Sequence, residues 1–385
     1  MINRKCCPIC GRNNYNNDKI FERDYFDSSF LAPMKNYIVY ICKECGFIYS
    51  GDIDYRISLD EYYSKYSKYE TESYNLGNDK YYKEESDLLL DNIKNKNISV
   101  LDVGCAGGTL LHFLNIAGIN NVLGLEISKA NCEFAKKQYG IDVINDSLGG
   151  DICEEKLGDL KFNLIIMTGV LEHIDNIVQA ITWCEKHLYE KGYLFIEVPD
   201  VSLFSLKNNL YQEFSVEHIN FFGLDSLDKL ISKFGFGLSA YHRNETYQSI
   251  RGLWQKNNLS PLKFDCPNSE NDIIKYISLC DDYCSSIKAK FYFYKDLKIN
   301  VWGAGSVLAM LIQKNVILKD NIYCIVDSNP NYLGLKAYDK VIESPSVLKN
   351  NNDYPILIAS QGAEKSIINQ IKSMGLKNEI ILLFS

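Results

Sequence analysis

The 385-residue chain lacks any apolar run approaching the ~20 residues that a membrane-spanning helix needs. Residues 1–6 also lack the apolar core of a secretory signal, so we expect a cytoplasmic protein with no membrane partner. Basic residues are fewer than acidic ones, with 41 Lys and Arg against 49 Asp and Glu, which gives a formal net charge of -8. That balance does not suit binding along a phosphate backbone, and we expect no nucleic-acid partner.

The chain has enough apolar material for a large core, since 46% of its residues are hydrophobic and 23% are charged. Disorder over most of the length is therefore excluded. At ~150 residues per domain, the length indicates two or three domains. We expect a monomer or a weak homo-oligomer. The 13 cysteines, in a reducing compartment, are expected to be free thiols or metal ligands rather than disulfides.

Short apolar runs alternate with helical patterns in two parts of the chain, which predicts an α/β fold with mostly parallel sheets. Strands are expected in the first part at residues 99–103, 121–126, 142–144, 164–167 and 192–198. In the second part they are expected from residue 299 and at 322–326, 356–359 and 380–383. The predicted organisation is a metal-binding module (1–54), a tyrosine-rich helical linker or lid (55–97), a ligand-binding α/β domain (98–254), a helical connector (255–297) and a smaller Rossmann-like domain (298–385).

Two C-x-x-C pairs, each followed by glycine, lie near the N-terminus. The four cysteines are Cys7, Cys10, Cys42 and Cys45. A two-residue gap lets one tight turn present two thiolates to one metal, and the glycine permits the turn. Free thiols or a redox pair are the alternatives, but redox pairs come singly beside a thioredoxin-like fold. We predict a structural Zn²⁺ site, because four cysteine ligands leave no open coordination position.

The run from Val100 to Leu111 places a glycine-rich turn between an apolar strand and an amphipathic helix. Such a turn lets a ligand approach the backbone and the free N–H groups of the helix. Glu126 ends the next strand, where a carboxylate can accept hydrogen bonds from ribose hydroxyls. Asp146 and Ser147 follow the third strand, where an adenine would lie. Structural roles are one alternative, in which Asp102 is a turn residue and Glu126 caps a helix. A dehydrogenase is another alternative, but the loop departs from the G-x-G-x-x-G pattern of such enzymes.

These segments resemble the class I S-adenosylmethionine (SAM)-dependent methyltransferases. Residues 165–174, which contain Leu171-Glu172-His173, are similar to the fourth strand and following turn of that family, and residues 192–199 match its fifth strand. The resemblance implies that SAM is bound by Asp102, Gly104, Cys105, Ala106, Gly107, Glu126, Ile127, Asp146, Ser147 and Thr168. It places His173 near the substrate, and a structural role is the alternative.

The segment 214–222 contains Glu217 and His218 among aromatic residues, after the fifth strand. An imidazole there suits general-base work, because it titrates near neutral pH and apolar neighbours exclude water. A core histidine is the alternative. Asn220 is a candidate substrate ligand.

The order of metal module, methyltransferase domain and C-terminal α/β unit resembles the sugar C-methyltransferases that act on nucleotide-linked keto-deoxysugars. That resemblance implies that Glu217 and His218 are catalytic. The chain departs from it at Ser215, where a tyrosine is expected, and at 357–362, which lacks a Trp-Asn pair. O-methylation of a sugar hydroxyl in polysaccharide or glycan synthesis is the alternative activity. A catalytically dead binding protein and an RNA methyltransferase are further alternatives, disfavoured by intact Asp102, Gly104 and Glu126 and by the net charge.

Tyrosines at near-helical spacing precede the central domain, at positions 62, 63, 66 and 69. They predict either a packing stripe or a lid, and the resemblance favours Tyr63 for the cofactor and Tyr66 for the substrate. The C-terminal unit repeats the strand–glycine and strand–acid scheme at 301–306 and 325–330. It is expected either to close over the nucleotide of the sugar donor or to act only as a wall.

Overall fold

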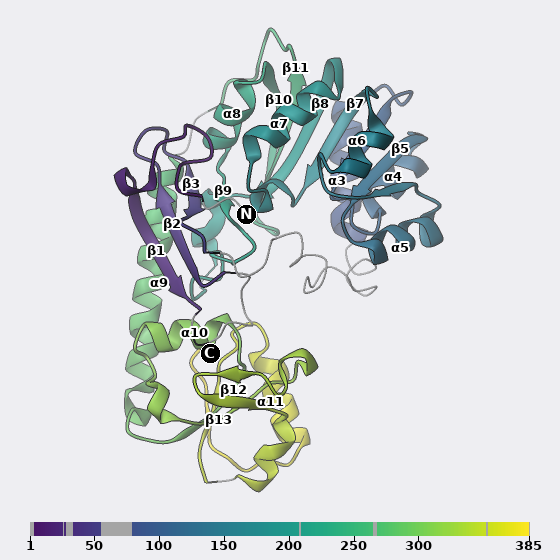
Figure 1. The fold of residues 1–385 in the computed structure, drawn as a ribbon. Helices are drawn as coiled ribbons and strands as arrows, with labels where there is room; N and C mark the ends of the chain where they lie inside the picture. Colours follow the sequence, from purple (N-terminus) through teal and green to yellow (C-terminus); the bar gives the residue numbers. More distant parts are fainter. Residues whose placement is uncertain are drawn as a thin grey trace.

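The structure, a computed structural model, describes residues 4–25, 27, 34–54, 79–207, 209–264, 268–351 and 353–384. Its described strands form three sheets. Figure 1 shows the largest sheet at the top, the C-terminal sheet at the bottom and the N-terminal sheet at the left between them. In the part of the chain that is described, no helix is both long and apolar enough to cross a bilayer.

The N-terminal sheet is antiparallel and has the order β1-β2-β3-β9. Its strands are β1 (Asp18–Asp24), β2 (Asn36–Ile41), β3 (Ile48–Gly51) and β9 (Asn220–Phe221). The last strand comes from the segment that follows the central sheet, nearly 170 residues later in the chain. Arg4 ties the same two parts together, because its guanidinium donates to the carbonyl of Ile219 (2.7 Å) and to Oδ1 of Asn220 (2.6 Å). The N-terminal sheet is therefore completed by a segment predicted for another domain.

The central sheet has the order β10-β11-β8-β7-β4-β5-β6. Its strands are β4 (Ser99–Val103), β5 (Asn121–Glu126), β6 (Val143–Asn145), β7 (Phe162–Thr168), β8 (Leu188–Pro199), β10 (Phe236–Asn244) and β11 (Ser249–Lys256). The five neighbouring strands β8, β7, β4, β5 and β6 are parallel to one another. Strands β10 and β11 form an antiparallel hairpin at the edge beside β8. The five parallel strands lie where the apolar runs predict them. The hairpin was not predicted.

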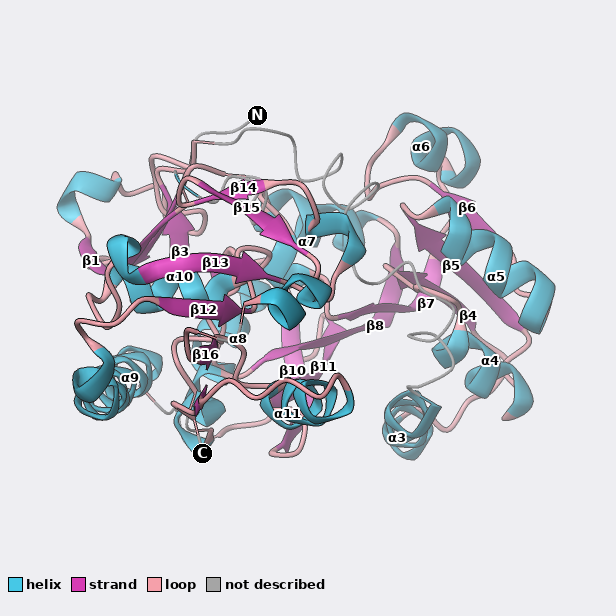
Figure 2. Cartoon of the chain, turned by 90° about the horizontal axis from the view of Figure 1, so that it is seen from below, coloured by secondary structure: helices cyan, strands magenta, loops and turns pink. Residues whose placement is uncertain are grey.

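Helices cover both faces of the central sheet (Figure 2). One face packs against α3 (Asp79–Asn92), α4 (Thr109–Ile116) and α5 (Lys129–Tyr139). The other packs against α6 (Asp151–Leu157), α7 (Ile177–Lys186) and α8 (Leu224–Ser232). Successive side chains of a strand point to opposite faces of the sheet. In β7, Ile165 and Met167 therefore join the apolar cluster on one face, while Leu164 and Ile166 join the cluster on the other. Helix α3 falls within the predicted linker (55–97), yet it packs on the central sheet and is therefore part of the central fold.

The C-terminal sheet has the order β14-β15-β13-β12-β16-β17 and is parallel except at β14. Its strands are β12 (Ile299–Trp302), β13 (Ile322–Val326), β14 (Lys336–Ala337), β15 (Lys340–Glu343), β16 (Ile356–Ile358) and β17 (Ile380–Ile381). Its helices are α10 (Ser306–Gln313) and α11 (Glu364–Ser373). Short 3₁₀ helices span Asn14–Asn16, Leu171–His173 (η4), Val201–Leu206, Tyr292–Tyr294, Lys319–Asn321, Pro330–Tyr332 and Pro345–Asn350.

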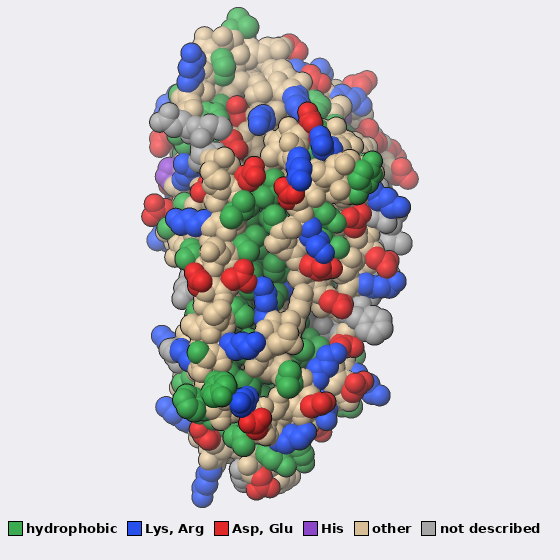
Figure 3. Space-filling model, turned by 90° about the vertical axis from the view of Figure 1, so that its left-hand side faces the viewer, with side chains coloured by type: hydrophobic (Ala, Val, Ile, Leu, Met, Phe, Trp, Pro, Cys, Tyr) green, Lys and Arg blue, Asp and Glu red, His purple; other side chains and the backbone are tan. Residues whose placement is uncertain are grey.

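Helix α9 (Ser269–Phe291) connects the central and C-terminal sheets along one side of the molecule (Figure 1). Its buried residues recur every three or four positions, as in Ile273, Tyr276, Cys280, Cys284 and Ile287. This stripe packs into a core that also contains side chains of the N-terminal and C-terminal sheets. On the side of the molecule shown in Figure 3, acidic and basic side chains are interspersed around a strip of apolar ones.

Candidate functional site

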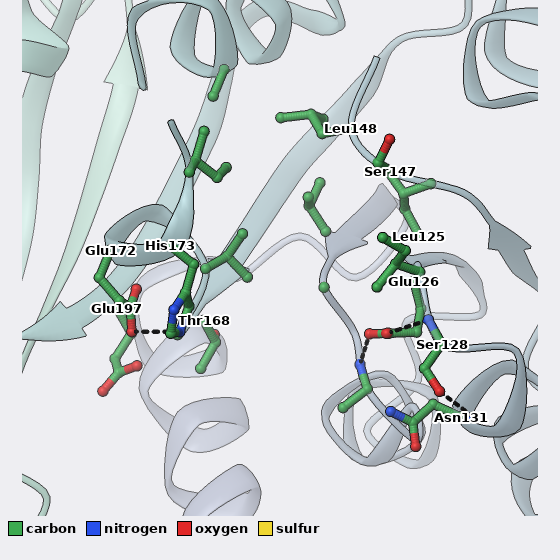
Figure 4. A pocket seen from close by; sticks show the side chains of 18 of the residues that line it. Leu125, Glu126, Ser128, Asn131, Ser147, Leu148, Thr168, Glu172, His173 and Glu197 are labelled. Atoms are coloured by element: carbon green, nitrogen blue, oxygen red, sulfur yellow. Dashed lines mark hydrogen bonds and ion pairs between the residues drawn. The ribbon is translucent and has the colours of Figure 1, made fainter. Parts of the chain in front are cut away.

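A cavity of about 820 Å³ opens at the carboxyl ends of the parallel central strands. Its walls include residues at the ends of β4, β5, β7 and β8 and in the turns that follow them. Ligands bind at this edge in open α/β sheets, because the strand ends and the helix N-termini face the same crevice. Figure 4 shows the side chains that point into it.

The glycine loop after β4 forms one wall of the cavity. Gly104 has a φ of +72°, and a Cβ there would lie 2.5 Å from Cγ2 of Val170. Its N–H donates to the carbonyl of Leu125 (2.7 Å) on the neighbouring strand. Gly108, which also has a positive φ, precedes the first residue of α4. Only glycine combines this left-handed backbone with so close an approach, so the sequence fixes a tight turn at the end of β4.

Glu126 at the end of β5 closes the loop. Its Oε2 accepts the N–H of Ala106 (3.0 Å) and its Oε1 accepts the N–H of Ser128 (2.8 Å), as drawn in Figure 4. Ser128 in turn caps α5 by accepting the N–H of Asn131 (3.3 Å). Glu126 is only 9% exposed yet lines the cavity, so its carboxylate lies where a bound ligand would meet it.

The far end of the cavity beyond Glu126 is lined by the turn after β6 and by α7. Asp146 accepts the N–H groups of Ser147 (2.9 Å) and Cys153 (2.8 Å), which fixes this turn. Trp183 presents its ring here, and its indole N–H donates to Oε1 of Glu154 (2.6 Å). A flat aromatic surface beside polar turn groups suits a planar base.

The opposite end of the cavity gathers ionisable side chains. Glu172 and His173 come from η4, and the ring centroid of His218 lies 5.1 Å from that of His173. Nδ1 of His173 is hydrogen-bonded to the carbonyl of Glu217 (2.7 Å), and its Nε2 lies 3.7 Å from Oε1 of Glu172. Burial, and then the charge of Glu197, raises the pKa of Glu172 well above its usual range. This end of the cavity therefore carries two imidazoles and two buried carboxyl groups.

A buried polar network lies behind the same end. Tyr81, at the start of α3, is hydrogen-bonded to Glu197 of β8, and Arg251 of β11 forms an ion pair with Glu85 of α3. The guanidinium of Arg251 lies over the ring of Tyr81, 5.6 Å from its centroid. The pKa of Glu197 is raised by burial. Three elements, α3, β8 and β11, are thus held together around the carboxylate that faces the cavity.

Nine of the residues singled out in the sequence line this cavity. They are Gly104, Ala106, Glu126, Ile127, Asp146, Ser147, Thr168, His173 and His218. Five others lie outside its lining: Asp102, Cys105, Gly107, Glu217 and Asn220. Asp102 is buried in β4, and burial followed by the charge of Glu126 raises its pKa well above its usual range. Asn220 instead donates to the carbonyls of Leu171 (3.0 Å) and Ile174 (2.8 Å), which holds η4 in place. Tyr63 and Tyr66 lie outside the described residues.

Sequence reasoning missed several lining residues, among them Tyr81, Tyr82, Trp183, Glu197 and Tyr247. Only Glu197 could have been noticed in the sequence, because it is a charged residue within the apolar run of β8. The others come from α3, α7 and the β10–β11 turn, and nothing in their local sequence points to a cavity.

The four paired cysteines come together at one end of the N-terminal sheet. Their sulfur atoms all lie within 4.8 Å of one another, with 3.6 Å between Cys7 and Cys45 and 3.4 Å between Cys10 and Cys42. Tetrahedral zinc with ~2.3 Å bonds to sulfur needs separations of about 3.8 Å, so the four ligands fit such an ion. The hydrogen bond with Cys7 lowers the pKa of Cys45 to about 5. Cys6 lies outside this group and is exposed.

Both cysteine turns have the same construction. The N–H of Gly11 donates to the carbonyl of Cys7 (2.9 Å), and that of Gly46 donates to the carbonyl of Cys42 (2.8 Å). The two glycines have φ values of +75° and +74°. The glycine after each pair is therefore required by the backbone, as the sequence predicted.

Comparison with known proteins identifies the central part of the chain. Residues 75–240 match the family model described as "Methyltransferase domain". Similar curated proteins include the ubiquinone biosynthesis O-methyltransferase of Pelagibacter ubique, 26% identical over 176 residues, which are 45% of this chain and 66% of that protein. The mitochondrial ubiquinone biosynthesis O-methyltransferase of Saccharomyces cerevisiae is 29% identical over 143 residues, 36% of this chain and 46% of that protein. The chain thus spans about half to two thirds of the length of these relatives.

A solved structure of similar outline is the magnesium protoporphyrin IX methyltransferase of Synechocystis PCC 6803 with bound SAH. It is 16% identical, with a TM-score of 0.41, and the match covers 51% of this chain and 98% of that one. The family match and the Rossmann-like order of the strands make residues 75–240 a methyltransferase domain of the class I, SAM-dependent type.

Proposed function

We propose that the protein transfers the methyl group of SAM to a nucleotide-linked keto-deoxysugar, with His218 as the proton acceptor. The observation that carries this proposal is the position of the two imidazoles. They line the same cavity as the glycine loop and Glu126, at the end away from the turn that follows β6. A cofactor held by its adenosine at one end would therefore present its methyl group toward His173 and His218.

Each wall at the adenosine end of the cavity then has its own role. Glu126 accepts hydrogen bonds from the ribose hydroxyls, the loop at Gly104 and Ala106 accommodates the methionine portion, and Trp183 lies against the base beside Asp146. The sulfonium of SAM supplies a methyl group that is already electrophilic. The protein's own contribution is then alignment of the acceptor and removal of its proton.

At the acceptor end, His218 takes the proton from the atom that attacks the methyl group. Its neighbour His173 is held by the hydrogen bond between Nδ1 and the carbonyl of Glu217, so its ring is fixed beside the acceptor. Thr168 Oγ1 is buried, lines the cavity and has no hydrogen-bond partner among the described residues. It is available to a hydroxyl or carbonyl oxygen of the substrate.

O-methylation of a sugar hydroxyl is the second candidate. The similar curated proteins carry the name O-methyltransferase, and Ser215 stands where the C-methyltransferase resemblance expects a tyrosine. The same base serves either route, because both remove one proton as the methyl group is attacked. The choice of a nucleotide sugar is supported by the resemblance of the whole chain rather than by the central domain.

The C-terminal unit is proposed to contact the nucleotide of the donor. Its loop after β16 touches the segment that leads to His218, because Oε1 of Gln361 accepts the N–H of Leu210 (3.3 Å). The four-cysteine cluster is proposed to hold a structural Zn²⁺ that stabilises the N-terminal sheet. That sheet contains β9, which follows His218 by two residues, so the metal supports the acceptor end indirectly.

The test is a matched pair of variants. His218→Asn is expected to bind SAM within about twofold of the parent while its turnover falls by about 10²- to 10⁴-fold, the usual contribution of a general base. His242→Asn, which changes an exposed histidine on β10, should alter neither quantity. Calorimetry with SAM and transfer of labelled methyl to a panel of nucleotide sugars provide the two measurements. NMR of the product then locates the label on carbon or oxygen. Full turnover in His218→Asn would place the base elsewhere.

A further inference from the structure

The segment that carries His218 has no regular secondary structure of its own. Residues 209–219, all of which the structure describes, contain turns but neither a helix nor a strand. Their own backbone bonds include only turn contacts, such as that from the N–H of His218 to the carbonyl of Ser215 (3.0 Å). Backbone carbonyls that are not paired within a segment need donors from elsewhere. The position of His218 therefore depends on what other parts of the protein offer to this segment.

Two cross-strand neighbours of the N-terminal sheet supply such donors. Arg23 of β1 and Tyr37 of β2 are directly paired in the antiparallel register, so their side chains lie on the same face of the sheet. The guanidinium of Arg23 donates to the carbonyls of Tyr211 (3.2 Å) and Phe214 (3.2 Å). The hydroxyl of Tyr37 donates to the carbonyl of His218 itself (2.6 Å). One pair of side chains thus holds the segment at three places along its length.

The contact between the sheet and the segment is dry as well as hydrogen-bonded. Arg23 is 2% exposed and Tyr37 is fully buried. The ring of Phe21, two residues before Arg23, stacks on that of Phe214 with 4.4 Å between the centroids. Loss of a buried donor leaves its acceptor without a partner, which costs more than the hydrogen bond itself contributed. The sheet therefore fixes both the place and the direction of the segment.

The hydrogen bond from Tyr37 acts at the residue whose imidazole lines the cavity. The next residue, Ile219, is also fixed, because its carbonyl accepts the N–H of Ser50 (2.8 Å) and its N–H donates to the carbonyl of Glu172 (2.9 Å). The backbone on the carboxyl side of His218 is thus clamped between the N-terminal sheet and η4. Positioning of this kind matters for a reaction rate, since a displacement of ~1 Å can cost 10²-fold.

We propose that Arg23 and Tyr37 are positioning residues for methyl transfer, which hold residues 209–219 so that the ring of His218 faces the cavity. Both side chains lie outside the lining of the cavity, so they act through the segment and not on the cofactor or the acceptor. The effect on the rate rests on the proposed function, whereas the fixing of the segment does not. The N-terminal sheet then has a role in turnover but none in SAM binding.

Tyr37→Phe and Tyr40→Phe are the matched pair that tests this role. Both tyrosines are buried on β2 and each donates a hydrogen bond of 2.6 Å, but Tyr40 donates to Oδ2 of Asp52 and not to the segment. In Tyr37→Phe we expect kcat to fall by about 10- to 100-fold while the Kd for SAM stays within about twofold. Amide hydrogen exchange should become faster in peptides that cover residues 209–219. Tyr40→Phe should leave kcat, the Kd for SAM and this exchange as they are in the parent.

Arg23→Lys is the second variant, and it keeps the test open if thermal unfolding shows that Tyr37→Phe does not fold. It retains the charge but loses the forked pair of donors, so the same fall in kcat and the same faster exchange are expected. Exchange in residues 209–219 that matches the parent in both variants overturns the positioning. An unchanged kcat, or a loss of SAM affinity as large as the loss of turnover, overturns the effect on the rate.

Failure of the proposed function would look different. Full turnover in His218→Asn would place the proton acceptor elsewhere, and the absence of methyl transfer to any nucleotide sugar would remove the proposed substrate. Faster exchange confined to residues 209–219 in Tyr37→Phe would still support the positioning of the segment in either case.

Discussion

The central and C-terminal sheets close their first loops in the same way. In the central sheet, the carboxylate of Glu126 accepts the N–H of Ala106, two residues after the turn glycine, and that of Ser128, two residues after itself. In the C-terminal sheet, Asp327 accepts the N–H of Ala304 (2.8 Å) and that of Asn329 (2.8 Å). The turn glycines also match. The N–H of Gly104 donates to the carbonyl of Leu125, directly before Glu126, and the N–H of Gly303 donates to the carbonyl of Val326, directly before Asp327.

The surroundings of the two loops differ. The central loop faces a cavity whose other walls come from residues as distant as Trp183, His218 and Tyr247. In the C-terminal unit, the loop after β16 turns toward the central domain, where Gln361 contacts Leu210. A carboxylate that closes a glycine loop is thus a feature of the fold in both places. The cavity around it is what makes the central one a candidate cofactor site.

The largest expected effect comes from filling the two turn glycines. Gly104→Ala places a Cβ 2.5 Å from the side chain of Val170, and Gly303→Ala places one 2.9 Å from the carbonyl oxygen of Ala359, both at positive φ. Each should lower the free energy of unfolding by about 2–4 kcal/mol, measured by chemical denaturation. Only Gly104→Ala should also weaken SAM binding by tenfold or more. Equal SAM affinity in both variants would contradict a cofactor role for the central loop.

An intermediate effect is expected from the two acids. Glu126→Gln replaces one accepting oxygen by an NH₂ group, so one backbone N–H loses its partner and the ribose loses a charged acceptor. We expect about a tenfold or larger loss in SAM affinity by calorimetry, because hydrogen bonds to charged groups contribute ~1.5–3 kcal/mol. Asp327→Asn makes the same change in the C-terminal loop and should leave SAM affinity unaltered. A loss of SAM binding in Asp327→Asn would show that the two loops are not independent.

The smallest effect is expected from the caps that follow the acids. Ser128 accepts the N–H of Asn131 at the start of α5, and Asn329 accepts the N–H of Asn331 at the start of a 3₁₀ helix. Ser128→Ala and Asn329→Ala should each cost about 1 kcal/mol, seen as a lower Tm. SAM affinity should change by less than about threefold in Ser128→Ala and not at all in Asn329→Ala. A larger change in Ser128→Ala would mean that its hydroxyl contacts the cofactor directly.

The sequence predicted the parallel strands well because each is a short apolar run ended by turn residues. β4, β5 and β13 begin and end at the expected residues. The prediction failed where pairing depends on distant partners. Strand β9 has only two residues and exists because β3 offers it an edge, and the β10–β11 hairpin extends β8 on its antiparallel side. The N-terminal module and the central domain therefore share a strand that no local pattern could reveal.

Local chemistry alone determined the turns of this protein. Glycines after the cysteine pairs and after β4 are required by positive φ, and a carboxylate at the end of the neighbouring strand is within reach of the loop in any sheet of this order. Only the tertiary structure decided which of these turns faces a cavity and which polar groups meet there. Glu172, Glu197 and His218 lie apart in the chain, and they become neighbours because β7 and β8 end, and β9 begins, beside the same cavity. Burial then gives them properties that their sequence positions do not contain, since the free energy of a charge depends on what surrounds it.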